Sequence, residues 1–282
     1  MKVYAQTHLP RRAAARLACA LVALCATGML AATPSLAYWK PPAKPTWYWQ
    51  LSGTVNNNEN VQVYDIDGFE NSAEEVATLH SKGVHVVCYI DAGGAEKYRP
   101  DYGKFLELEK AGIPIMGAKI GGWPEERWIN VRELAYLEPI MKARFEMCKA
   151  KGFDAVEPDE IEVWAESAKH QGIKPAVTKA QQLAYNEWIA ETVHSLGMAV
   201  LQKNDGAQTS EEDSYFDGAL TEQCNQYSEC GDFEPYLAAG EPVINAEYSE
   251  KTSKFCAKDE AAGIMGARFN LALNGKRFEP CW

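Results

Sequence analysis

Short apolar segments alternate with amphipathic helical stretches from residue 61 onward, and this alternation limits the fold more than any other feature of the sequence. Eight segments have the composition of strands: 61–67, 84–91, 127–131, 153–159, 198–204, 218–224, 242–248 and 263–269. Strands that alternate with helices pair in parallel through right-handed crossovers. The pattern therefore predicts an α/β protein whose single domain is a (β/α)8, TIM-type barrel.

The intervening segments carry the apolar stripe of a helix, which repeats every 3.6 residues. In residues 181–197 the stripe includes Leu183, Ile189 and Val193, and Gly197 ends the segment as a C-terminal glycine often does. Residues 73–83 and 133–152 also read as helices, and both end in Lys-Gly.

A short extra N-terminal strand, WYWQL at residues 47–51, precedes the eight, so the strand numbering could shift by one. A doubly wound open sheet is the alternative to the barrel. The glycine-rich dinucleotide loop that such folds place after the first strand does not occur at residues 68–73.

The N-terminal residues predict an exported protein. Arg11, Arg12 and Arg16 precede the apolar segment 17–30, which is too short to span a bilayer, and Ser-Leu-Ala at 35–37 suits a signal peptidase. We therefore expect a signal peptide at 1–37 and a (β/α)8 domain at 38–282, which places the protein in the periplasm or outside the cell. A retained membrane anchor is the alternative, and the apolar segment is too short for it.

The charge of the chain limits its partners. Residues 1–37 hold four cationic side chains and no acids, so the net charge of −11 becomes −11 − 4 = −15 after cleavage. Nucleic acids and anionic membranes need a basic surface, and neither is expected as a partner. A cationic or neutral partner fits, and we expect a monomer.

Six cysteines follow the expected cleavage site, an even number that suggests disulfides in an oxidising compartment. Cys224 is expected to pair with Cys230 across a short polar loop, and Cys256 with Cys281 at the C-terminus. Cys88 and Cys148 fit a buried thiol as well as a bond.

Polar side chains gather at the C-terminal ends of the expected strands, where a β/α barrel builds its active site. The segment GFDAVEPDEIEVWAE, residues 152–166, is the most acidic of these ends. The strand-end residues are Asp65, Asp67, Tyr89, Asp91, Asn130, Glu157, Asp159, Lys203, Asn204, Glu222, Gln223, Glu247 and Arg268. The carboxylates are therefore expected to line a mouth rather than to lie in a core.

Several carboxylates with nearby tryptophans and tyrosines are typical of a sugar-cleaving site, where one carboxyl acts as acid and base and another as nucleophile or water activator. A Ser–His–Asp triad is disfavoured because no GxSxG motif occurs. Two alternatives remain at the same acidic mouth. One is a non-catalytic carbohydrate-binding barrel, and the other is a metal-dependent hydrolase with hard oxygen ligands.

Seven segments together resemble glycoside hydrolase family 114, the endo-α-1,4-polygalactosaminidases: VQVYDIDGF, VVCYIDAGGAEKYRPD, RWINV, GFDAVEPDEIE, LQKN, EQCNQYSEC and NAEY. The resemblance implies a (β/α)8 barrel that cleaves α-1,4-linked galactosamine polymers. We expect neither a cofactor nor a metal. Where the family often carries Asn after Glu-Pro-Asp, this chain has Glu160. A chain of net charge −15 suits a substrate that carries amines.

Asp159 and Glu222 are the expected catalytic pair. By analogy with α-acting retaining barrels, Asp159 on the fourth strand is the nucleophile and Glu222 on the sixth is the acid/base. Glu247 on the seventh strand is the rival. The residues assigned to substrate binding are Asp65, Tyr89, Asp91, Glu157, Lys203, Asn225, Glu247 and Trp164.

Overall fold

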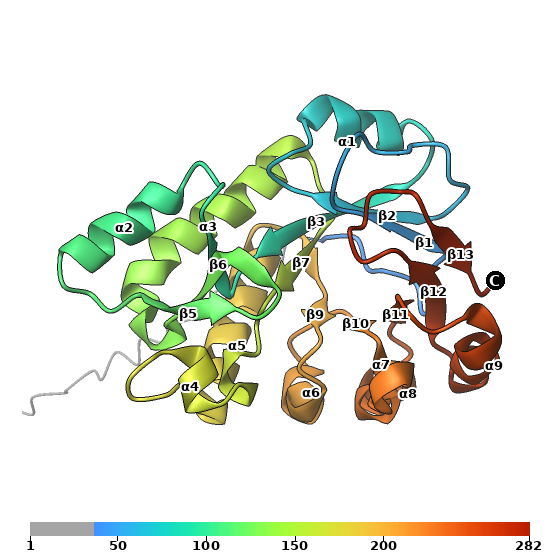
Figure 1. Cartoon of the computed structure of the whole chain (residues 1–282). Coiled ribbons are helices and arrows are strands. Elements are labelled where there is room, and N and C mark those ends of the chain that lie inside the picture. The colour runs from blue at the N-terminus through green and yellow to red at the C-terminus, as the bar shows by residue number, and fades with distance from the viewer. Residues whose placement is uncertain (1–36) are drawn as a thin grey trace, which may run out of the picture. The chain divides into compact units, whose positions relative to one another are not determined.

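Eight parallel strands form the (β/α)8 barrel of this chain in a computed structural model that describes residues 37–282 (Figure 1). The expected signal peptide lies outside the described residues except for Ala37. The barrel strands are β1 (Trp47–Gln50), β2 (Val63–Asp67), β3 (His85–Asp91), β7 (Ala155–Asp159), β8 (Ala199–Val200) continued by β9 (Gln202–Lys203), β10 (Ala219–Glu222), β11 (Val243–Glu247) and β12 (Met265–Phe269). Only Leu201 separates β8 from β9, which joins two five-stranded sheets into one series.

The C-terminal segment lies at the seam between the last and first barrel strands. β13 (Phe278–Pro280) runs antiparallel to β12 and pairs with the edge of β12 that faces away from β11. The rings of Phe278 and Tyr48, on β1, are 5.0 Å apart, and Trp47 Nε1 donates a hydrogen bond to Met265 O. These contacts bring both ends of the strand series together.

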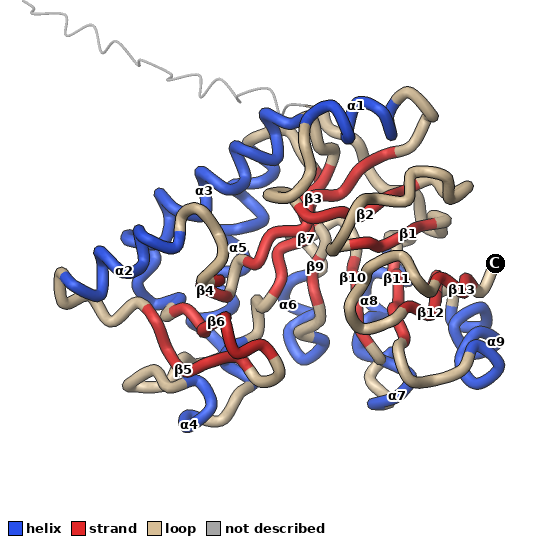
Figure 2. Tube along the Cα trace, turned by 45° about the horizontal axis from the view of Figure 1, so that its top comes forward, coloured by secondary structure: helices blue, strands red, loops and turns tan. Residues whose placement is uncertain are grey.

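A separate antiparallel sheet corrects one expectation. β4 (Gly94–Glu96), β5 (Met116–Ile120) and β6 (Trp123–Ile129) pair in the order β4-β6-β5, to one side of the barrel (Figure 2). Residues 127–131 were expected to be a barrel strand, but their strand portion belongs to β6 of this sheet. Residues 47–51, expected as an extra strand, supply the first barrel strand instead. The two differences offset each other, so β7 and β10 remain the fourth and sixth barrel strands.

The helices begin and end at residues that explain their bounds. In α5 (Lys179–Ser195), Thr178 and Gln181 form a capping box, and α1 (Ala73–His80) begins after Ser72, whose side chain accepts from Glu75 N. α3 (Leu134–Lys151) ends at Gly152, which adopts a left-handed φ of 93°. The other helices are α2 (Tyr102–Lys110), α4 (Ala168–Gln171), α6 (Thr209–Glu212), α7 (Cys224–Tyr227), α8 (Glu234–Ala239) and α9 (Thr252–Ala262). The three helices expected from the sequence are confirmed.

Three disulfides brace this architecture. Cys224–Cys230 and Cys256–Cys281 match the expected pairs, and the first follows directly on β10. Cys88 and Cys148, for which the sequence left a thiol and a bond equally open, are bonded and connect β3 to α3. In the part of the chain that the structure describes, no helix is both long and apolar enough to cross a membrane.

Candidate active site

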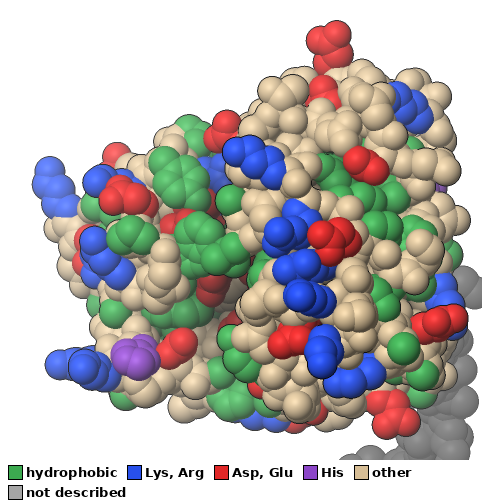
Figure 3. Space-filling model, turned by 45° about the vertical axis from the view of Figure 1, so that its right-hand side comes forward, with side chains coloured by type: hydrophobic (Ala, Val, Ile, Leu, Met, Phe, Trp, Pro, Cys, Tyr) green, Lys and Arg blue, Asp and Glu red, His purple; other side chains and the backbone are tan. Residues whose placement is uncertain are grey.

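A cavity of about 680 Å³ opens at the C-terminal ends of the barrel strands. Figure 3 shows the surface hollowed between two lobes, with acidic side chains inside the hollow. Its lining includes Trp49, Asp67, Tyr89, Tyr98, Arg99, Trp123, Glu126, Asp159, Glu160, Glu162, Trp164, Lys203, Asn204, Asp205, Glu222, Tyr227, Glu229, Asp232, Tyr248 and Leu271. Nine of these side chains are acidic and two are cationic, so the cavity is strongly negative.

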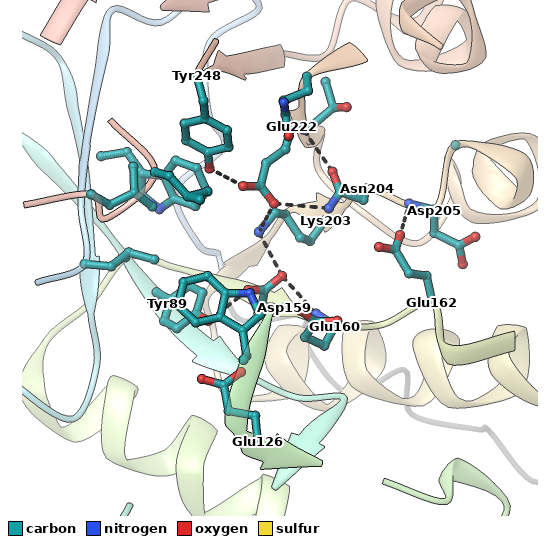
Figure 4. A pocket seen from close by; sticks show the side chains of 18 of the residues that line it. Tyr89, Glu126, Asp159, Glu160, Glu162, Lys203, Asn204, Asp205, Glu222 and Tyr248 are labelled. Carbon is teal, nitrogen blue, oxygen red and sulfur yellow. Dashed lines mark hydrogen bonds and ion pairs between the residues drawn. The ribbon is translucent and has the colours of Figure 1, made fainter. Parts of the chain in front are cut away.

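Lys203, at the end of β9, is the cation at the centre of this cavity. Its Nζ lies 2.8 Å from Asp159 Oδ1 and 3.2 Å from Glu222 Oε2, between the ends of β7 and β10 (Figure 4). A third carboxylate, Glu157, lies 3.0 Å below it. Burial lowers the pKa of Lys203, but the surrounding carboxylates outweigh burial and hold this pKa well above its usual value. Lys203 is therefore a fixed positive charge shared by the two expected catalytic carboxyls.

Each of those two carboxyls also receives a tyrosine hydroxyl. Tyr89 Oη donates to Asp159 Oδ2 at 2.8 Å, and Tyr248 Oη donates to Glu222 Oε1. Asn204 bridges the second carboxyl, because its Nδ2 donates to Glu222 Oε2 and its Oδ1 accepts from the Glu222 backbone N–H. Asp159 and Glu222 are thus held from both sides, while about 15% and 25% of their side-chain surfaces remain exposed to the cavity.

The backbone around this centre is unusual. Of the six non-glycine residues with positive φ in residues 37–282, five line the cavity. Each such conformation costs of order 1 kcal/mol or more in a non-glycine residue and persists only where the surroundings enforce it. Glu160, Asn204, Asp205 and Gln223 follow directly on Asp159, Lys203 and Glu222. The chain turns sharply at each strand end and leaves those three side chains facing the cavity.

The opposite wall comes from the antiparallel sheet and from the loop after β7. Glu126 on β6 accepts a hydrogen bond from Tyr98 Oη, and burial raises the Glu126 pKa to about 7. Burial, followed by the charge of Asp205, raises the pKa of Glu162 to about 8. Burial and neighbouring carboxylates raise the pKa of Glu160 as well. Cationic partners of these three groups are absent from the ion pairs of residues 37–282, and a cation bound beside them would favour their ionised forms.

Exposed aromatic and aliphatic side chains stand at the rim. Trp123 on β6 is 46% exposed and Tyr98 58%, and both belong to the wall built by the antiparallel sheet. Tyr227 and Leu271 are each 59% exposed and also line the cavity. Aromatic faces present large apolar surfaces to ring-shaped ligands. The rim therefore suits a chain of sugar rings.

The structure brings together five of the residues assigned from the sequence and separates the other five from the cavity. Those that line it are Asp159, Glu222, Tyr89, Lys203 and Trp164. Those outside its lining are Asp65, Asp91, Glu157, Asn225 and Glu247. Direct substrate contact is accordingly proposed for the first five only.

The five residues outside the lining have other partners. Asp91 Oδ1 accepts from the N–H groups of Gly93 and Gly94, and Asn225 Nδ2 donates to Asp259. Glu247 is fully buried, and its Oε1 accepts from Asn225 N and Asn245 Nδ2. Glu157 and Asp65 are buried beneath Lys203.

Tyr98 and Glu126 are lining residues that the sequence reasoning missed. Glu126 lies on β6 of the inserted antiparallel sheet, and Tyr98 lies in the turn that follows β4, within the segment VVCYIDAGGAEKYRPD. The available signals were the acidic pair Glu125–Glu126 between two tryptophans and, for Tyr98, its place in that family-like segment. Within residues 37–282, no group of three or more His, Cys, Asp or Glu side chains is arranged to hold a metal ion.

A (β/α)8 barrel with paired carboxylates at its C-terminal mouth and an aromatic rim defines a glycoside hydrolase. The sequence profile of Glycoside-hydrolase family GH114 matches residues 29–280. The chain therefore belongs to glycoside hydrolase family 114, as the resemblance implied.

Solved structures agree with this fold. The structure of Aspergillus fumigatus Ega3 in complex with galactosamine is similar, with a TM-score of 0.77 and 28% identity over 87% of this chain and 98% of that chain. The glycoside hydrolase domain of PelA from Pseudomonas aeruginosa has a TM-score of 0.60 and 10% identity over 84% of this chain and 98% of that domain, which shows the fold alone. No curated protein sequence matches the chain.

Proposed function

We propose that this protein is exported and cleaves α-1,4-linked galactosamine polymers internally, with retention at the anomeric carbon. Asp159 is the nucleophile, and Glu222 is the acid that protonates the leaving oxygen and then the base that activates water. Family membership and the likeness to Ega3, which was solved with galactosamine, support the substrate class. The acidic cavity supports a substrate with protonated amines, since opposite charges attract most strongly where water is partly excluded.

The separation of the two carboxyls is the observation that carries the mechanism. Asp159 Oδ1 and Glu222 Oε2 both contact Lys203 Nζ, at 2.8 and 3.2 Å, so they cannot be farther apart than the sum of these distances. Retaining glycosidases hold their carboxyls about 5–5.5 Å apart, whereas inverting enzymes need about 6.5–9.5 Å to fit a water molecule. This upper limit on the separation of the two oxygens lies below the inverting range, which supports a nucleophilic carboxylate and therefore retention.

The reaction divides into two balanced steps. Asp159 attacks the anomeric carbon while Glu222 gives its proton to the glycosidic oxygen, which breaks the old C–O bond and forms a glycosyl ester. Glu222 then takes a proton from water, the water oxygen bonds to the anomeric carbon, and Asp159 leaves as a carboxylate. The positive charge of Lys203 remains beside whichever carboxyl is anionic.

The test uses residues 38–282 and a deacetylated α-1,4-galactosamine polymer, with the acetylated polymer in parallel. Mass spectrometry should find internal cleavage products, and NMR at early times should find the α-anomer. Asp159→Asn and Glu222→Gln should each lose about three or more decades of kcat, the scale for an essential catalytic group. Glu247→Gln should keep at least about a tenth of the activity, because its carboxylate lies outside the cavity lining.

Several outcomes would contradict the proposal. Loss in Glu247→Gln alone would assign the catalytic role to that rival. A β-anomeric product would replace retention with inversion, and binding without cleavage would make the barrel a carbohydrate-binding protein. Turnover that a chelator abolishes and a divalent cation restores would indicate a metal-dependent hydrolase. Export is tested separately by N-terminal sequencing of secreted material, which should begin at Tyr38.

A further inference from the structure

The Lys203 ammonium is held from below by a carboxylate that does not line the cavity. Glu157 lies two residues before Asp159 on β7, so both side chains point to the same side of the strand, with Glu157 deeper in the barrel. Its Oε1 lies 3.0 Å from Lys203 Nζ, and its side chain is fully buried. Asp159 and Glu222 contact the same nitrogen from above.

A second buried carboxyl group lies against Glu157. Asp65, on β2, is 1% exposed, and its carboxyl group lies close enough to the Glu157 carboxyl group for each to influence the pKa of the other. Among the described residues, neither oxygen of Asp65 has a hydrogen-bond donor. Two carboxylates cannot hydrogen-bond each other unless one of them carries a proton. A hydrogen bond between Asp65 and Glu157 therefore requires a proton on one of the two carboxyl groups.

The local charge balance indicates which carboxyl holds it. Glu157 has Lys203 as a cationic partner, whereas Asp65 has none within the described ion pairs. Burial and then the charge of Glu157 raise the pKa of Asp65 well above its usual value. Burial also raises the Glu157 pKa, to about 7, against the opposing effect of Lys203. The neutral member of the pair is Asp65.

We propose that Asp65 carries a proton that it donates to Glu157, and that this buried pair is a positioning device that keeps the Lys203 ammonium between Asp159 and Glu222. The consequence for catalysis rests on the proposed function. When Asp159 attacks and Glu222 gives up its proton, the negative charge moves from the first carboxyl to the second. An ammonium in contact with both stabilises either arrangement without moving, which is how preorganised electrostatics lowers a barrier.

Other titratable and charged groups face this centre from the surrounding elements and bear on any pH dependence. The Trp49 ring on β1 lies 4.9 Å from Lys203 Nζ. The titratable groups are Asp65 on β2, Tyr89 on β3, Glu157 and Asp159 on β7 with Glu160 next to them, Lys203 on β9, Glu222 on β10 and Tyr248 after β11. Lys203 is the cation in this set. Removing one buried negative charge should therefore change the electrostatic environment of both catalytic carboxyl groups.

Two substitutions at Asp65 separate the donated proton from the shape of the side chain. Leu branches at Cγ as Asp does but donates nothing, and Asp65→Leu should lower kcat/KM at least about tenfold. Asn is neutral and can donate, and Asp65→Asn should restore most of that loss with both limbs of the pH–rate profile at their wild-type positions. Equal activity in the two variants would overturn the role of the donated proton. A shift of both limbs to lower pH in Asp65→Asn would show that Asp65 is charged.

Glu157→Gln tests the other member of the pair. Removing its negative charge should move both limbs of the kcat/KM profile to lower pH by about one unit, the usual effect of a unit charge at this range. A folded Glu157→Gln variant with an unshifted profile would overturn the positioning role. A loss of stability alone, which any buried substitution can cause, would leave the limbs in place.

Protein stability tests the proton without any substrate. A carboxyl whose pKa is raised by folding stabilises the native state below its unfolded pKa, near 3.8 for Asp, and this contribution is lost as the pH rises. Asp65→Asn should therefore gain stability relative to wild type as the pH rises above about 4. The opposite trend would mean that Asp65 is ionised and would overturn the proposal even if the protein proved inactive on galactosamine polymers. If Asp65→Asn does not fold, the pH dependence of the stability of Asp65→Leu relative to wild type provides the same test.

Discussion

The hydroxyl of Tyr89 lies 2.8 Å from Asp159 Oδ2, the carboxylate oxygen that Lys203 does not contact. Tyr89 is on β3 and Asp159 ends the neighbouring strand β7, and the two residues are two positions apart in the ladder register. Between them, Tyr89 and Lys203 direct both oxygens of the carboxylate. This arrangement leaves little rotational freedom to the group proposed to attack the anomeric carbon.

Tyr89→Phe should lower kcat/KM about 10- to 100-fold, because a hydrogen bond to a charged group contributes about 1.5–3 kcal/mol. The loss of a donor to Asp159 disfavours its anion, so the acidic limb of the pH–rate profile should move to higher pH. Tyr248→Phe makes the same change at Glu222 and should move the alkaline limb instead. Profiles of both variants on the galactosamine polymer check this, and an identical effect of the two substitutions would contradict the separate roles.

Trp123→Ala should raise KM for long polymers with little change in kcat. The indole lines the cavity and is 46% exposed. Stacking on a ring contributes about 0.5–1.5 kcal/mol, or about 2- to 12-fold in KM. Tyr136→Ala is the matched control, because Tyr136 is 42% exposed on α3 and does not line the cavity. Steady-state kinetics on polymer and on short oligomers should show the Trp123 effect mainly on the polymer. Equal KM values for the two variants would remove Trp123 from the binding surface.

The sequence predicts a cavity-lining residue correctly where its position at the end of a strand is enough to place its side chain at the cavity. Asp159, Lys203 and Glu222 end parallel strands, and such ends meet at one face of a barrel whatever the exact strand count. Depth in the barrel could not be predicted. Glu157 and Asp159 share a face because they are two residues apart, but the stagger between strands decides which of them reaches the cavity. That stagger is a long-range property with no local sequence signal.

The antiparallel sheet shows a second limit. Residues 127–131 are short and largely apolar, as a barrel strand could be, and residues 47–51 read equally well as a strand. The choice between them depends on pairing partners: β6 pairs with β4 and β5, while β1 pairs with β2. Glu126 reaches the cavity through that pairing, and Tyr98 through the turn that follows β4. Their contribution to the site therefore became visible only in three dimensions.

Replacing both cysteines of the Cys224–Cys230 disulfide by Ser should lower the free energy of unfolding by about 2 kcal/mol, the chain-entropy value for so short a loop. The bond closes the turn that follows Glu222, where Gln223 has a left-handed φ of 56°. We therefore expect kcat to fall more than KM changes. Urea denaturation and kinetics of the double variant check both effects. The corresponding Cys256→Ser/Cys281→Ser variant, whose bond joins α9 to the C-terminal segment, is the control and should lose stability with a smaller loss of kcat.

Glu212→Gln should stabilise the protein progressively as the pH rises from about 5 to 8. Glu212 is fully buried in α6; its Oε1 accepts from Asn186 and Gln208, while its Oε2 has no partner among the described residues. Burial, followed by the charge of Asp205, raises its pKa to about 8.

The sign of this effect follows from proton uptake on folding. A carboxyl with a raised native pKa stabilises the fold below its unfolded pKa of 4.5, and this stabilisation disappears as the pH passes through about 8. Gln resembles the protonated acid at every pH, so the variant keeps what the wild type loses, about 2–4 kcal/mol at pH 8. Glu211→Gln, at the exposed neighbour that pairs with Lys179, should show little change across the same range. Thermal unfolding of the three proteins between pH 5 and 8 measures the effect, and a constant difference between Glu212→Gln and wild type would show that Glu212 does not titrate in this window.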